Sequence, residues 1–343
     1  MNKVVICGLK FAIDHYMSSH VSVLSGRYDV SVLPIESIIY SFDRRGKFSI
    51  LKDLYYIRNF IINEKPFFVI TVGPKVGFLF SIVCALLKVR HIHWFTGQVW
   101  ALSRFKYFAL GFYIDFFISF FSFKSFTDGH NQSKFLRENL CSRFKFHCPS
   151  VPSINGLSSK FDECRSTVVN RRKVIFAGRF CQDKGIQDFL LVARHFSSTN
   201  LSFHMYGSFD VYEEHSRFKK DAALLPNLNI HEGSYDSKSI YDDAFLLILP
   251  TKREGFCSTL IEAQACGVPV LVSNIYGVRD AFVNFQTGLS CNDLEDFLRA
   301  VALLLENDSL HGLLSRNAVQ FSSKFKAFYY ARSLNDFYLS HGV

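Results

Sequence analysis

Two cations stand close together in the second half of the chain, where an apolar run ends. Arg179 and Lys184 lie five positions apart in RFCQDKGIQDF, directly after KVIFAG, and Gly185 opens a helical pattern. Two cations beside the positive end of a helix are suited to binding a diphosphate. Two solvated charges on a loop are the alternative, and the pattern alone favours this alternative.

Two glutamates follow in KREGFCSTLIEAQACGVPVLVS, eight positions apart. Glu254 falls in the loop after the apolar run FLLILPT, and Glu262 falls in the first turn of the helix that follows. Glu254 could instead be an exposed loop carboxylate, and Glu262 could complete a capping box with Thr259. Gly255 allows a close approach of the backbone, and the N–H groups of residues 256–259 would point at an anion.

Together the two loops predict one pocket, in which cations hold a diphosphate and carboxylates accept hydrogen bonds from hydroxyl groups. A nucleoside diphosphate sugar has these parts. The chain has neither a GxxxxGK[ST] loop nor a GxGxxG fingerprint, which argues against a P-loop NTPase and an ordinary NAD enzyme. No Asp-x-Asp motif follows a strand, and the protein's own cations would neutralise the phosphates. We therefore expect no metal ion and no other cofactor.

Short apolar runs alternate with helical patterns along the chain, which is typical of parallel sheets covered by helices. The first half contains the runs VVICGL, DVSVLPI, FFVITVG, HIHWFTG and SFKSFTD, and the second half contains KVIFAGR, LSFHMYG, NLNIHEG, FLLILPT and PVLVS. We therefore expect an α/β protein with two Rossmann-like, doubly wound parallel-sheet domains facing a cleft. Such sheets bind ligands beyond the carboxyl ends of their strands, so the loops after these runs are the expected sites.

The length of 343 residues suits two domains. A stretch rich in Ser and Pro, CPSVPSINGLSSKFDECRSTVVN, separates the two series of apolar runs. We expect a first domain over 1–150, a linker over 151–172 and a second domain over 173–325. A C-terminal helix over 326–343 is expected to pack back on the first domain.

The formal charge of +9 belongs to the first half, because residues 1–150 carry 19 Lys+Arg against 9 Asp+Glu. A basic, aromatic-rich domain attracts polyanions, and without a nucleic-acid motif a membrane surface is the favoured partner. No secretory signal peptide is recognised, so we expect a cytoplasmic protein on the inner face of the cytoplasmic membrane. Segment 105–123 has the length of a membrane span, but Lys106 and Asp115 interrupt it. Its place between two strands favours a buried or interface-docked helix.

Several of these stretches also carry a family resemblance. VIFAGRFCQDKGIQDFL, the glycine of HMYG, NIHEGSYDSKSIYDDAFLLILPTKREGFCSTLIEAQACGVPVLVS and YGVRD resemble the donor-binding domain of family 4 glycosyltransferases, which are retaining enzymes of the GT-B fold. EGFCSTLIE is similar to the paired-glutamate motif of that family. TVGPKVGFLFSIVCALLKVRHIHWFTGQVWA, DGHNQSKFL and PSINGLSSKFD resemble segments of the bacterial transferases that build O-antigen, capsule and exopolysaccharide chains on a lipid carrier.

The resemblance implies catalytic roles for three residues. Arg179 and Lys184 would bind the donor diphosphate and stabilise charge on the departing phosphate. Glu254 would contact hydroxyl groups of the transferred sugar near its reacting face, and Glu262 would hold the nucleoside ribose. The further donor-binding residues that it implies are Gly207, Gly233, Tyr235, Gly255, Phe256, Cys257, Ser258 and Thr259, with the backbone of 256–259 at the diphosphate and the loop 233–235 at the base.

In the first domain, the resemblance implies that five residues lie on the acceptor or sugar side: Gly8, Lys75, Thr96, Gly97 and Gln98. Many relatives have a histidine in a Thr-x-His-Gly pattern after the strand equivalent to HIHWF. Thr96 stands at that place here, so no histidine is assigned a role in the reaction. We expect His91, His93 and Trp100 to be packing residues.

The function that these features imply is retaining transfer of a sugar from a nucleoside diphosphate sugar to a lipid-linked saccharide acceptor. The reaction would belong to bacterial surface polysaccharide synthesis, such as that of lipopolysaccharide O-antigen, capsule or exopolysaccharide. The alternatives are a sugar-nucleotide epimerase of similar two-domain fold and a non-catalytic sugar-nucleotide-binding protein.

Overall fold

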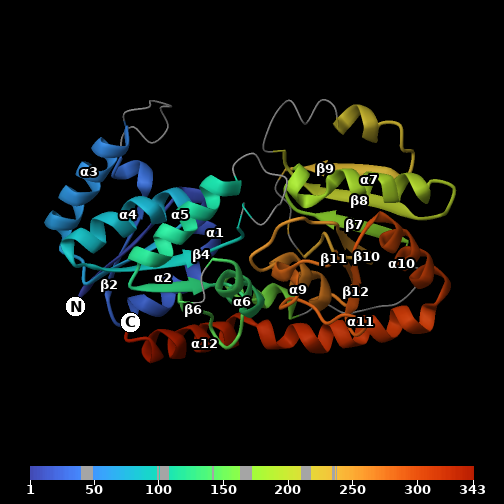
Figure 1. Ribbon diagram of the computed structural model, residues 1–343. Helices are drawn as coiled ribbons and strands as arrows, with labels where there is room; N and C mark the ends of the chain where they lie inside the picture. Colours follow the sequence, from blue (N-terminus) through green and yellow to red (C-terminus); the bar gives the residue numbers. More distant parts are fainter. Residues whose placement is uncertain are drawn as a thin grey trace. The chain divides into compact units, whose positions relative to one another are not determined.

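The computed structural model forms two compact units (Figure 1). Unit 1 comprises Met1–Gly156 and Ala327–Val343, and unit 2 comprises Leu157–Lys326. The division between them falls inside the stretch expected as a linker, so its residues 151–156 belong to unit 1. The structure describes residues 1–39, 49–98, 100, 108–140, 143–162, 172–209, 218–233, 236 and 238–343.

Unit 1 is built on a parallel sheet of six strands in the order β2-β1-β3-β4-β5-β6. The strands are β1 (Lys3–Gly8), β2 (Asp29–Pro34), β3 (Phe68–Val72), β4 (Arg90–Phe95), β5 (Lys124–Thr127) and β6 (Phe146–His147). The strand order reverses between β1 and β3, so the chain leaves these neighbours toward opposite faces. A crevice at the carboxyl ends of such a pair is where open α/β sheets bind ligands.

Helices cover both faces of this sheet, because successive residues of a strand point to opposite sides. Val4 and Ile6 of β1 join a core with helices α1, α2 and α12, whereas Val5 and Cys7 join a second core with α3 and α4. Helices α5 and α6 enclose a third cluster with the end of β4. The helices are α1 (Lys10–Tyr16), α2 (Ser18–Ser25), α3 (Ser49–Glu64), α4 (Pro74–Leu87), α5 (Phe108–Phe121), α6 (His130–Asn139) and α12 (Ala327–Ser340).

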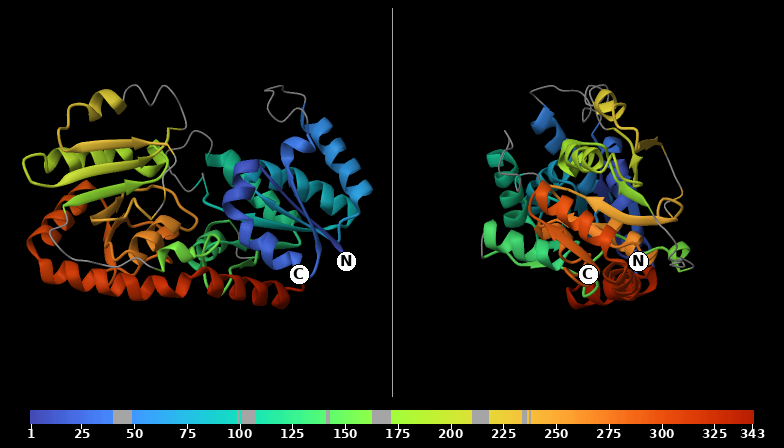
Figure 2. Two further views of the ribbon diagram at one scale, coloured as in Figure 1. Left: turned by 180° about the vertical axis from the view of Figure 1, so that it is seen from behind. Right: turned by 90° about the vertical axis from the view of Figure 1, so that its right-hand side faces the viewer.

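The C-terminal helix α12 belongs to unit 1 although it follows unit 2 in the sequence (Figure 2). Its Tyr338 hydroxyl lies 2.8 Å from Nδ1 of His20 on α2, and both groups are buried. Ser333 of α12 bonds the backbone N–H of Val151 at 2.8 Å. These buried polar contacts attach both the end of the chain and residue 151 to the first sheet.

Helix α5 is the apolar segment expected to be a helix. It has 14 residues and starts at Phe108; residues 105–107 of the expected segment lie outside the described residues. At the rise of an α-helix it is about 21 Å long, less than the roughly 30 Å of a bilayer core. Within the described part of the chain, no helix has the length and hydropathy needed to cross a membrane.

Unit 2 repeats the architecture with a parallel sheet in the order β12-β11-β10-β7-β8-β9. Its strands are β7 (Lys173–Ala177), β8 (Ser202–Gly207), β9 (Leu228–Glu232), β10 (Ala244–Leu249), β11 (Val270–Ser273) and β12 (Gly288–Cys291). Its main helices are α7 (Ile186–His195), α9 (Ser258–Ala265), α10 (Leu294–Glu306) and α11 (Asp308–Ser322). The order reverses between β7 and β10, which makes their loops the expected ligand site of this unit.

The expected fold class, with two doubly wound parallel sheets, is confirmed. Elements that the apolar runs did not indicate are α2, α6, β6 and β12. The strands β6 and β12 are short and lie at sheet edges, so they lack a long apolar run. Residues 218–222 are also helical, and residues 210–217 before them lie outside the described part of the chain.

Candidate active site

An ion pair joins the loops that follow β7 and β10. We call this place, where the strand order of unit 2 reverses, its switch point. Nζ of Lys184 lies 2.5 Å from Oε1 of Glu254, and both side chains are mostly buried. Burial by itself lowers the pKa of Lys184, but the charge and hydrogen bond of Glu254 outweigh it and raise the pKa above its ordinary value. Lys184 is therefore a cation fixed at the carboxyl edge of the sheet, 70 residues from its partner in sequence.

Asp183 fastens the same two loops from the other side. Its backbone carbonyl accepts from the N–H of Lys252 at 2.7 Å, and its carboxylate accepts from Nε and Nη2 of Arg253 at 3.1 and 2.9 Å. The hydroxyl of Thr251 lies 3.2 Å from Oε1 of Glu254. Asp183 precedes Lys184 and Arg253 precedes Glu254 in the chain, so these contacts hold both members of the ion pair in place.

Two glycines allow close approaches around the ion pair, Gly185 between the two loops and Gly277 where the turn after β11 meets the Glu254 loop. Gly185 has φ 71°, and a Cβ there would lie 1.9 Å from the carbonyl oxygen of Pro250 at the end of β10. A Cβ at Gly277 would lie 2.0 Å from the carbonyl oxygen of Glu254. No other residue fits either place without moving backbone. The Lys184 and Glu254 loops are thus held in contact by backbone as well as by charge.

Glu262 accepts a hydrogen bond from the hydroxyl of Tyr241 at 2.9 Å. Burial raises the pKa of Glu262, and the bond from Tyr241 acts against that rise. The alternative of a capping box with Thr259 is wrong, because α9 starts at Ser258, its N-cap is Cys257 and no side chain caps it. Glu262 is therefore the fifth residue of α9, just beyond the first turn.

The residues that lead into α9 are buried, and the first turn of the helix follows them directly. Phe256 and Cys257 are buried, and Gly255 is buried beside them. Burial raises the pKa of the Cys257 thiol, so it is an uncharged packing group. Ser258 and Thr259 are half-buried in the first turn. Since the first N–H groups of a helix have no acceptor within it, this turn can bind an anion.

The remaining donor-side residues lie at the ends of neighbouring strands. Arg179 follows β7 and is exposed, and its charge lowers the pKa of Lys184, which places the two cations within electrostatic reach. Gly207 ends β8, and its carbonyl accepts from the N–H of Gly233 at 3.2 Å. Tyr235 lies outside the described residues. The structure thus brings Arg179, Lys184 and Glu254 to one edge of one sheet.

Unit 1 has a pocket at the carboxyl edge of its own sheet. It encloses about 100 Å³, and its lining includes Gly73, Thr96, Gly97, Gln98 and Asp115. The amide of Gln98 is buried and donates to the carbonyl of Thr96 at 2.7 Å.

Two other acceptor-side residues of the prediction do not line this pocket. Gly8 ends β1 against Val72, and Lys75 is exposed in the first turn of α4. Gln132 of α6, which the sequence did not single out, also donates to the carbonyl of Thr96, at 2.6 Å. The Thr96 backbone is therefore held by two amide side chains.

The two histidines of β4 are internal. His91 Nε2 and His93 Nδ1 each lie 2.8 Å from the hydroxyl of Thr71 on β3, and all three side chains are buried. Burial lowers the pKa of His91 to about 3 and that of His93 well below its ordinary value. Both rings are therefore neutral packing groups near neutral pH, as expected from their place in the strand.

Trp100 is also a packing residue. Its Nε1 donates to Oδ2 of Asp115 at 2.8 Å, and its ring stacks on Phe135 with centroids 5.4 Å apart. Burial raises the pKa of Asp115 to about 7, against the effect of the Trp100 bond. The carboxylate that interrupts the apolar segment thus points into the protein.

Four residues of unit 2 that hold the site were missed by the sequence analysis: Asp183, Thr251, Arg253 and Tyr241. Asp183 and Arg253 each stand beside a predicted residue and carry the opposite charge, which is a signal that could have suggested a second ion pair. Nothing in YDDAF marks Tyr241 as the partner of Glu262, because the contact joins residues 21 apart across the sheet edge. Within the ranges that the structure describes, no group of three or more His, Cys, Asp or Glu side chains could hold a metal ion.

The fold and this site define a glycosyltransferase of the GT-B class. Residues 162–321 match the family described as "Glycosyl transferases group 1". The match covers nearly all of unit 2, which is therefore a glycosyl transferases group 1 domain, as the motifs indicated, and the protein is a glycosyltransferase. The capsular polysaccharide biosynthesis glycosyltransferase CapM of Staphylococcus aureus is 29% identical over 291 residues, which are 79% of this chain and 75% of CapM.

A second relative matches a shorter part of the chain. It is an N,N'-diacetylbacillosaminyl-diphospho-undecaprenol alpha-1,3-N-acetylgalactosaminyltransferase of Campylobacter jejuni, 32% identical over 87 residues, which are 25% of this chain and 23% of the relative. Solved structures with the same fold include sucrose-phosphate synthase from Thermosynechococcus elongatus, with TM-score 0.78, 13% identity and 99% of each chain covered. HepE of Anabaena in complex with UDP superposes with TM-score 0.76 and 10% identity over 98% of this chain and 100% of HepE.

Proposed function

We propose that this glycosyltransferase is a retaining enzyme that moves a sugar from a nucleoside diphosphate sugar to a lipid-linked saccharide acceptor in bacterial surface polysaccharide synthesis. The observation that carries the proposal is the Lys184–Glu254 pair at the β7/β10 switch point. A cation for the diphosphate and a carboxylate for sugar hydroxyls are adjacent there, beside the first turn of α9. Glu262 lies eight residues further along and would reach the ribose.

The relatives support the donor and acceptor classes in this proposal. HepE has been crystallised with UDP and glucose and with UDP-glucose. The name of the Campylobacter relative specifies an acceptor on diphospho-undecaprenol, and CapM is named for capsular polysaccharide biosynthesis. We infer the same classes here, and a place for the enzyme at the inner face of the cytoplasmic membrane, where such acceptors present their sugars.

In the proposed reaction, the bond from the anomeric carbon to a phosphate oxygen breaks while the acceptor oxygen bonds to that carbon on the same face. The acceptor's proton passes to the departing phosphate oxygen. Arg179, Lys184 and the first N–H groups of α9 stabilise the negative charge that grows on the diphosphate. Glu254 orients hydroxyl groups of the sugar. Retention then needs no protein nucleophile.

We further propose that transfer does not depend on a metal ion, because Arg179 and Lys184 supply positive charge at the diphosphate. Transfer should continue at an unchanged rate in the presence of EDTA. Loss of activity on chelation, with recovery on addition of magnesium or manganese, would contradict this part of the proposal.

The test of the function starts with thermal unfolding of the purified protein against a panel of nucleotide sugars. A ligand at 100 times its dissociation constant stabilises the protein by about 2.7 kcal/mol. The stabilising donor is then incubated with polyprenyl-diphosphate saccharides, and the anomer of the product is read by NMR. An inverted product would contradict retention. Conversion of the donor to an epimer without acceptor would identify an epimerase, and binding without turnover would identify a binding protein.

A further inference from the structure

Helix α5 exposes an aromatic face to solvent. Five of its residues recur on one side of the helix at spacings of three, seven, ten and eleven residues from the first, which is the periodicity of an α-helical stripe. Their side chains are Leu110 (58% exposed), Tyr113 (57%), Phe117 (42%), Phe120 (61%) and Phe121 (37%). We call these five residues the α5 stripe. Contiguous exposed apolar surface of this kind marks an interaction site.

The polarity of α5 is the reverse of that of an ordinary surface helix. Its single charged residue, Asp115, is buried against Trp100, and Ser119 is also buried. Two pairs of rings stack along the helix: Phe117 and Phe121 have centroids 6.4 Å apart, and the half-buried Phe116 lies 6.5 Å from Phe120. Helix α5 thus turns its buried polar side chains inward and an ordered set of rings outward.

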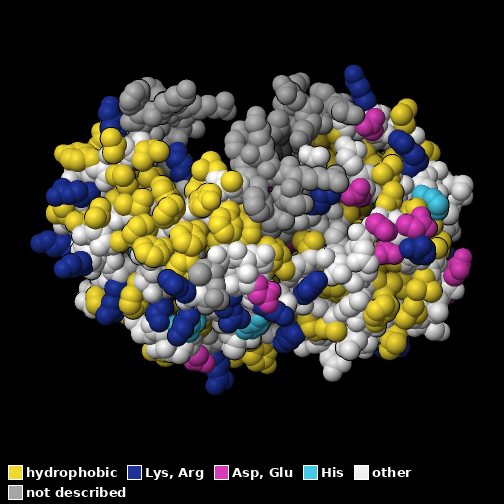
Figure 3. All heavy atoms as spheres, in the orientation of Figure 1, with side chains coloured by type: hydrophobic (Ala, Val, Ile, Leu, Met, Phe, Trp, Pro, Cys, Tyr) yellow, Lys and Arg dark blue, Asp and Glu magenta, His cyan; other side chains and the backbone are white. Residues whose placement is uncertain are grey.

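Cations surround the stripe. The guanidinium of Arg90 lies 5.3 Å from the ring centre of Phe123, and Nζ of Lys124 lies 5.5 Å from the same ring, which is 50% exposed. Lys88 at the end of α4 and Arg137 on α6 are exposed. Among the described residues of α4, α5 and α6, the one exposed carboxylate is Glu138, which lies 4.0 Å from Lys134. Figure 3 shows the hydrophobic field over α4 and α5 with Lys and Arg side chains at its border.

We propose that the α5 stripe and its basic border dock unit 1 on an anionic phospholipid surface, with α5 lying in the plane of the interface. Aromatic rings bordered by Lys and Arg, with Glu138 as the one exposed carboxylate among the described residues of α4 to α6, are the composition of an interfacial membrane site. A second copy of this chain fits less well, because self-association would bring two basic borders together. This inference rests on the proposed function in one respect, since a lipid-linked acceptor requires an enzyme at the membrane surface.

The first experiment is cosedimentation of the full chain with vesicles. The protein should pellet with vesicles of phosphatidylglycerol and phosphatidylcholine at low salt, and weakly with pure phosphatidylcholine. Salt at 0.5 M should release a large part of the bound protein, on the order of tenfold, because it screens the basic border. Equal binding to both vesicle types, or none to either, would overturn the proposal.

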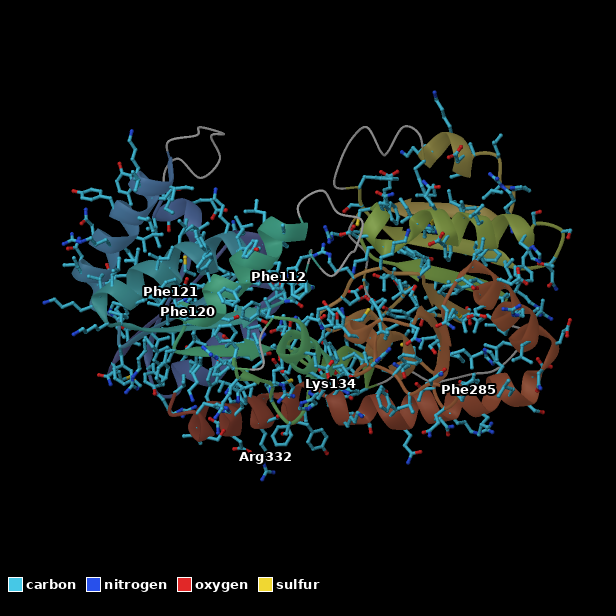
Figure 4. All side chains as sticks on the ribbon, in the orientation of Figure 1. Phe112, Phe120, Phe121, Lys134, Phe285 and Arg332 are labelled. Carbon is cyan, nitrogen blue, oxygen red and sulfur yellow. The ribbon has the colours of Figure 1, made fainter. Side chains whose placement is uncertain are left out.

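The second experiment distinguishes binding through the α5 stripe from nonspecific hydrophobic adsorption. The double variant Tyr113→Ser/Phe120→Ser should lose about tenfold or more in vesicle partition, since two large apolar side chains no longer enter the interface. The matched control is Phe285→Ser, because Phe285 is a phenylalanine of unit 2 that is more exposed (76%) than either stripe residue, and this variant should bind as the wild type does (Figure 4). Unchanged binding by the double variant, with its thermal unfolding intact, would overturn the proposal.

The charges are tested in the same way. Arg90→Gln/Arg137→Gln should weaken binding to anionic vesicles about fivefold for each cation removed. The control Arg299→Gln/Arg316→Gln removes two exposed cations of unit 2 and should leave binding unchanged. Equal losses in both pairs would show that net charge alone binds the vesicles and would overturn the assignment to α5.

Binding of the stripe to a second copy of the chain or to another protein would give different results. A dimer by light scattering that Tyr113→Ser/Phe120→Ser converts to a monomer would assign the stripe to self-association instead. Fluorescence of a Tyr113→Trp variant should be quenched by brominated anionic lipids, which a protein partner would not cause. Donor binding is measured on the same samples: vesicle binding without any nucleotide-sugar binding defeats the proposed function alone, and the reverse result defeats the membrane site alone.

Discussion

Units 1 and 2 share one architecture but use it differently. Each has a six-stranded parallel sheet with one reversal of strand order, between β1 and β3 in unit 1 and between β7 and β10 in unit 2. In unit 2 the reversal is surrounded by charged residues in two loops fastened together, among them Lys184 and Glu254. In unit 1 the strand ends there are Gly8 and Val72, the exposed Lys75 follows β3, and the carboxylate of Asp115 on α5 is buried. The same fold thus supports charge chemistry in one unit and packing in the other, so function has to be argued from the site.

The largest effect should follow from removing the cation of unit 2. Lys184→Ala should lower kcat by about 10²- to 10³-fold, because a charge aimed at the departing phosphate contributes about 3 to 4 kcal/mol to transition-state stabilisation. Arg299→Ala, on α10 of the same unit, is the control and should keep wild-type rates. Steady-state transfer assays measure both rates. Near wild-type activity in Lys184→Ala would contradict the claim that the switch point of unit 2 carries the charge chemistry.

The stability of the protein should depend on pH in opposite directions through Asp115, a buried carboxyl of unit 1, and Asp296, a partly exposed carboxyl of unit 2. Burial raises the pKa of Asp115 to about 7, so the folded state binds a proton that the unfolded state releases above about pH 4, and wild-type stability is lost as pH rises through 7. Asp115→Asn, which keeps an acceptor for Trp100, should therefore gain stability relative to the wild type by about 1 kcal/mol per pH unit between 4 and 7.

Asp296 supplies the comparison for this pH test. A hydrogen bond from Arg299, with others from Asn292, lowers the pKa of Asp296 to about 2, so its stabilisation is present above about pH 4 and is lost as pH falls toward 2. Asp296→Asn should therefore be less stable than the wild type at neutral pH and equal to it near pH 2. Urea unfolding at a series of pH values measures both variants, and parallel profiles would contradict the contrast.

A glycine pair tests whether backbone contact builds the site of unit 2. Gly185→Ala should destabilise the protein by more than about 1 kcal/mol, because φ is 71° and a Cβ would lie 1.9 Å from the Pro250 carbonyl. Gly312→Ala in α11 meets its nearest atom at 3.4 Å and should stabilise by about 0.5 to 1 kcal/mol. Thermal unfolding compares them. If both variants gained stability, the close approach of Gly185 to the Pro250 carbonyl would not be needed to build the site.

The smallest effect should come from the hydrogen bond behind Glu262. Tyr241→Phe removes one donor at 2.9 Å and should weaken nucleotide binding by several-fold, or about 1 kcal/mol, since Glu262 keeps its place in α9. Glu262→Gln should cost more, because the ribose would lose a charged acceptor. Titration calorimetry with the donor nucleotide measures both, and a larger loss in Tyr241→Phe than in Glu262→Gln would assign the binding role to the tyrosine.

The fold and the donor-side loops could be predicted because their signals are local. Apolar runs that end in glycine or charged residues mark buried parallel strands, and Arg179, Lys184 and Glu254 follow such runs directly. The sequence left a capping box open as an alternative, because Thr259 and Glu262 have its spacing. The structure excludes the capping box, because α9 starts at Ser258 and no side chain caps it, and it shows the Tyr241 hydroxyl bonded to Glu262 instead.

By itself, the sequence determined the alternation of strands and helices, the position of the charged loops and the basic character of the first half, because each depends on residues close together in the chain. The tertiary structure decided the strand order, the Lys184–Glu254 pair, the burial of Asp115 and the outward direction of the α5 stripe. These depend on which distant segments meet. A helix with apolar residues around most of its circumference does not record which side the core will cover, so packing sets which of its rings remain in solvent.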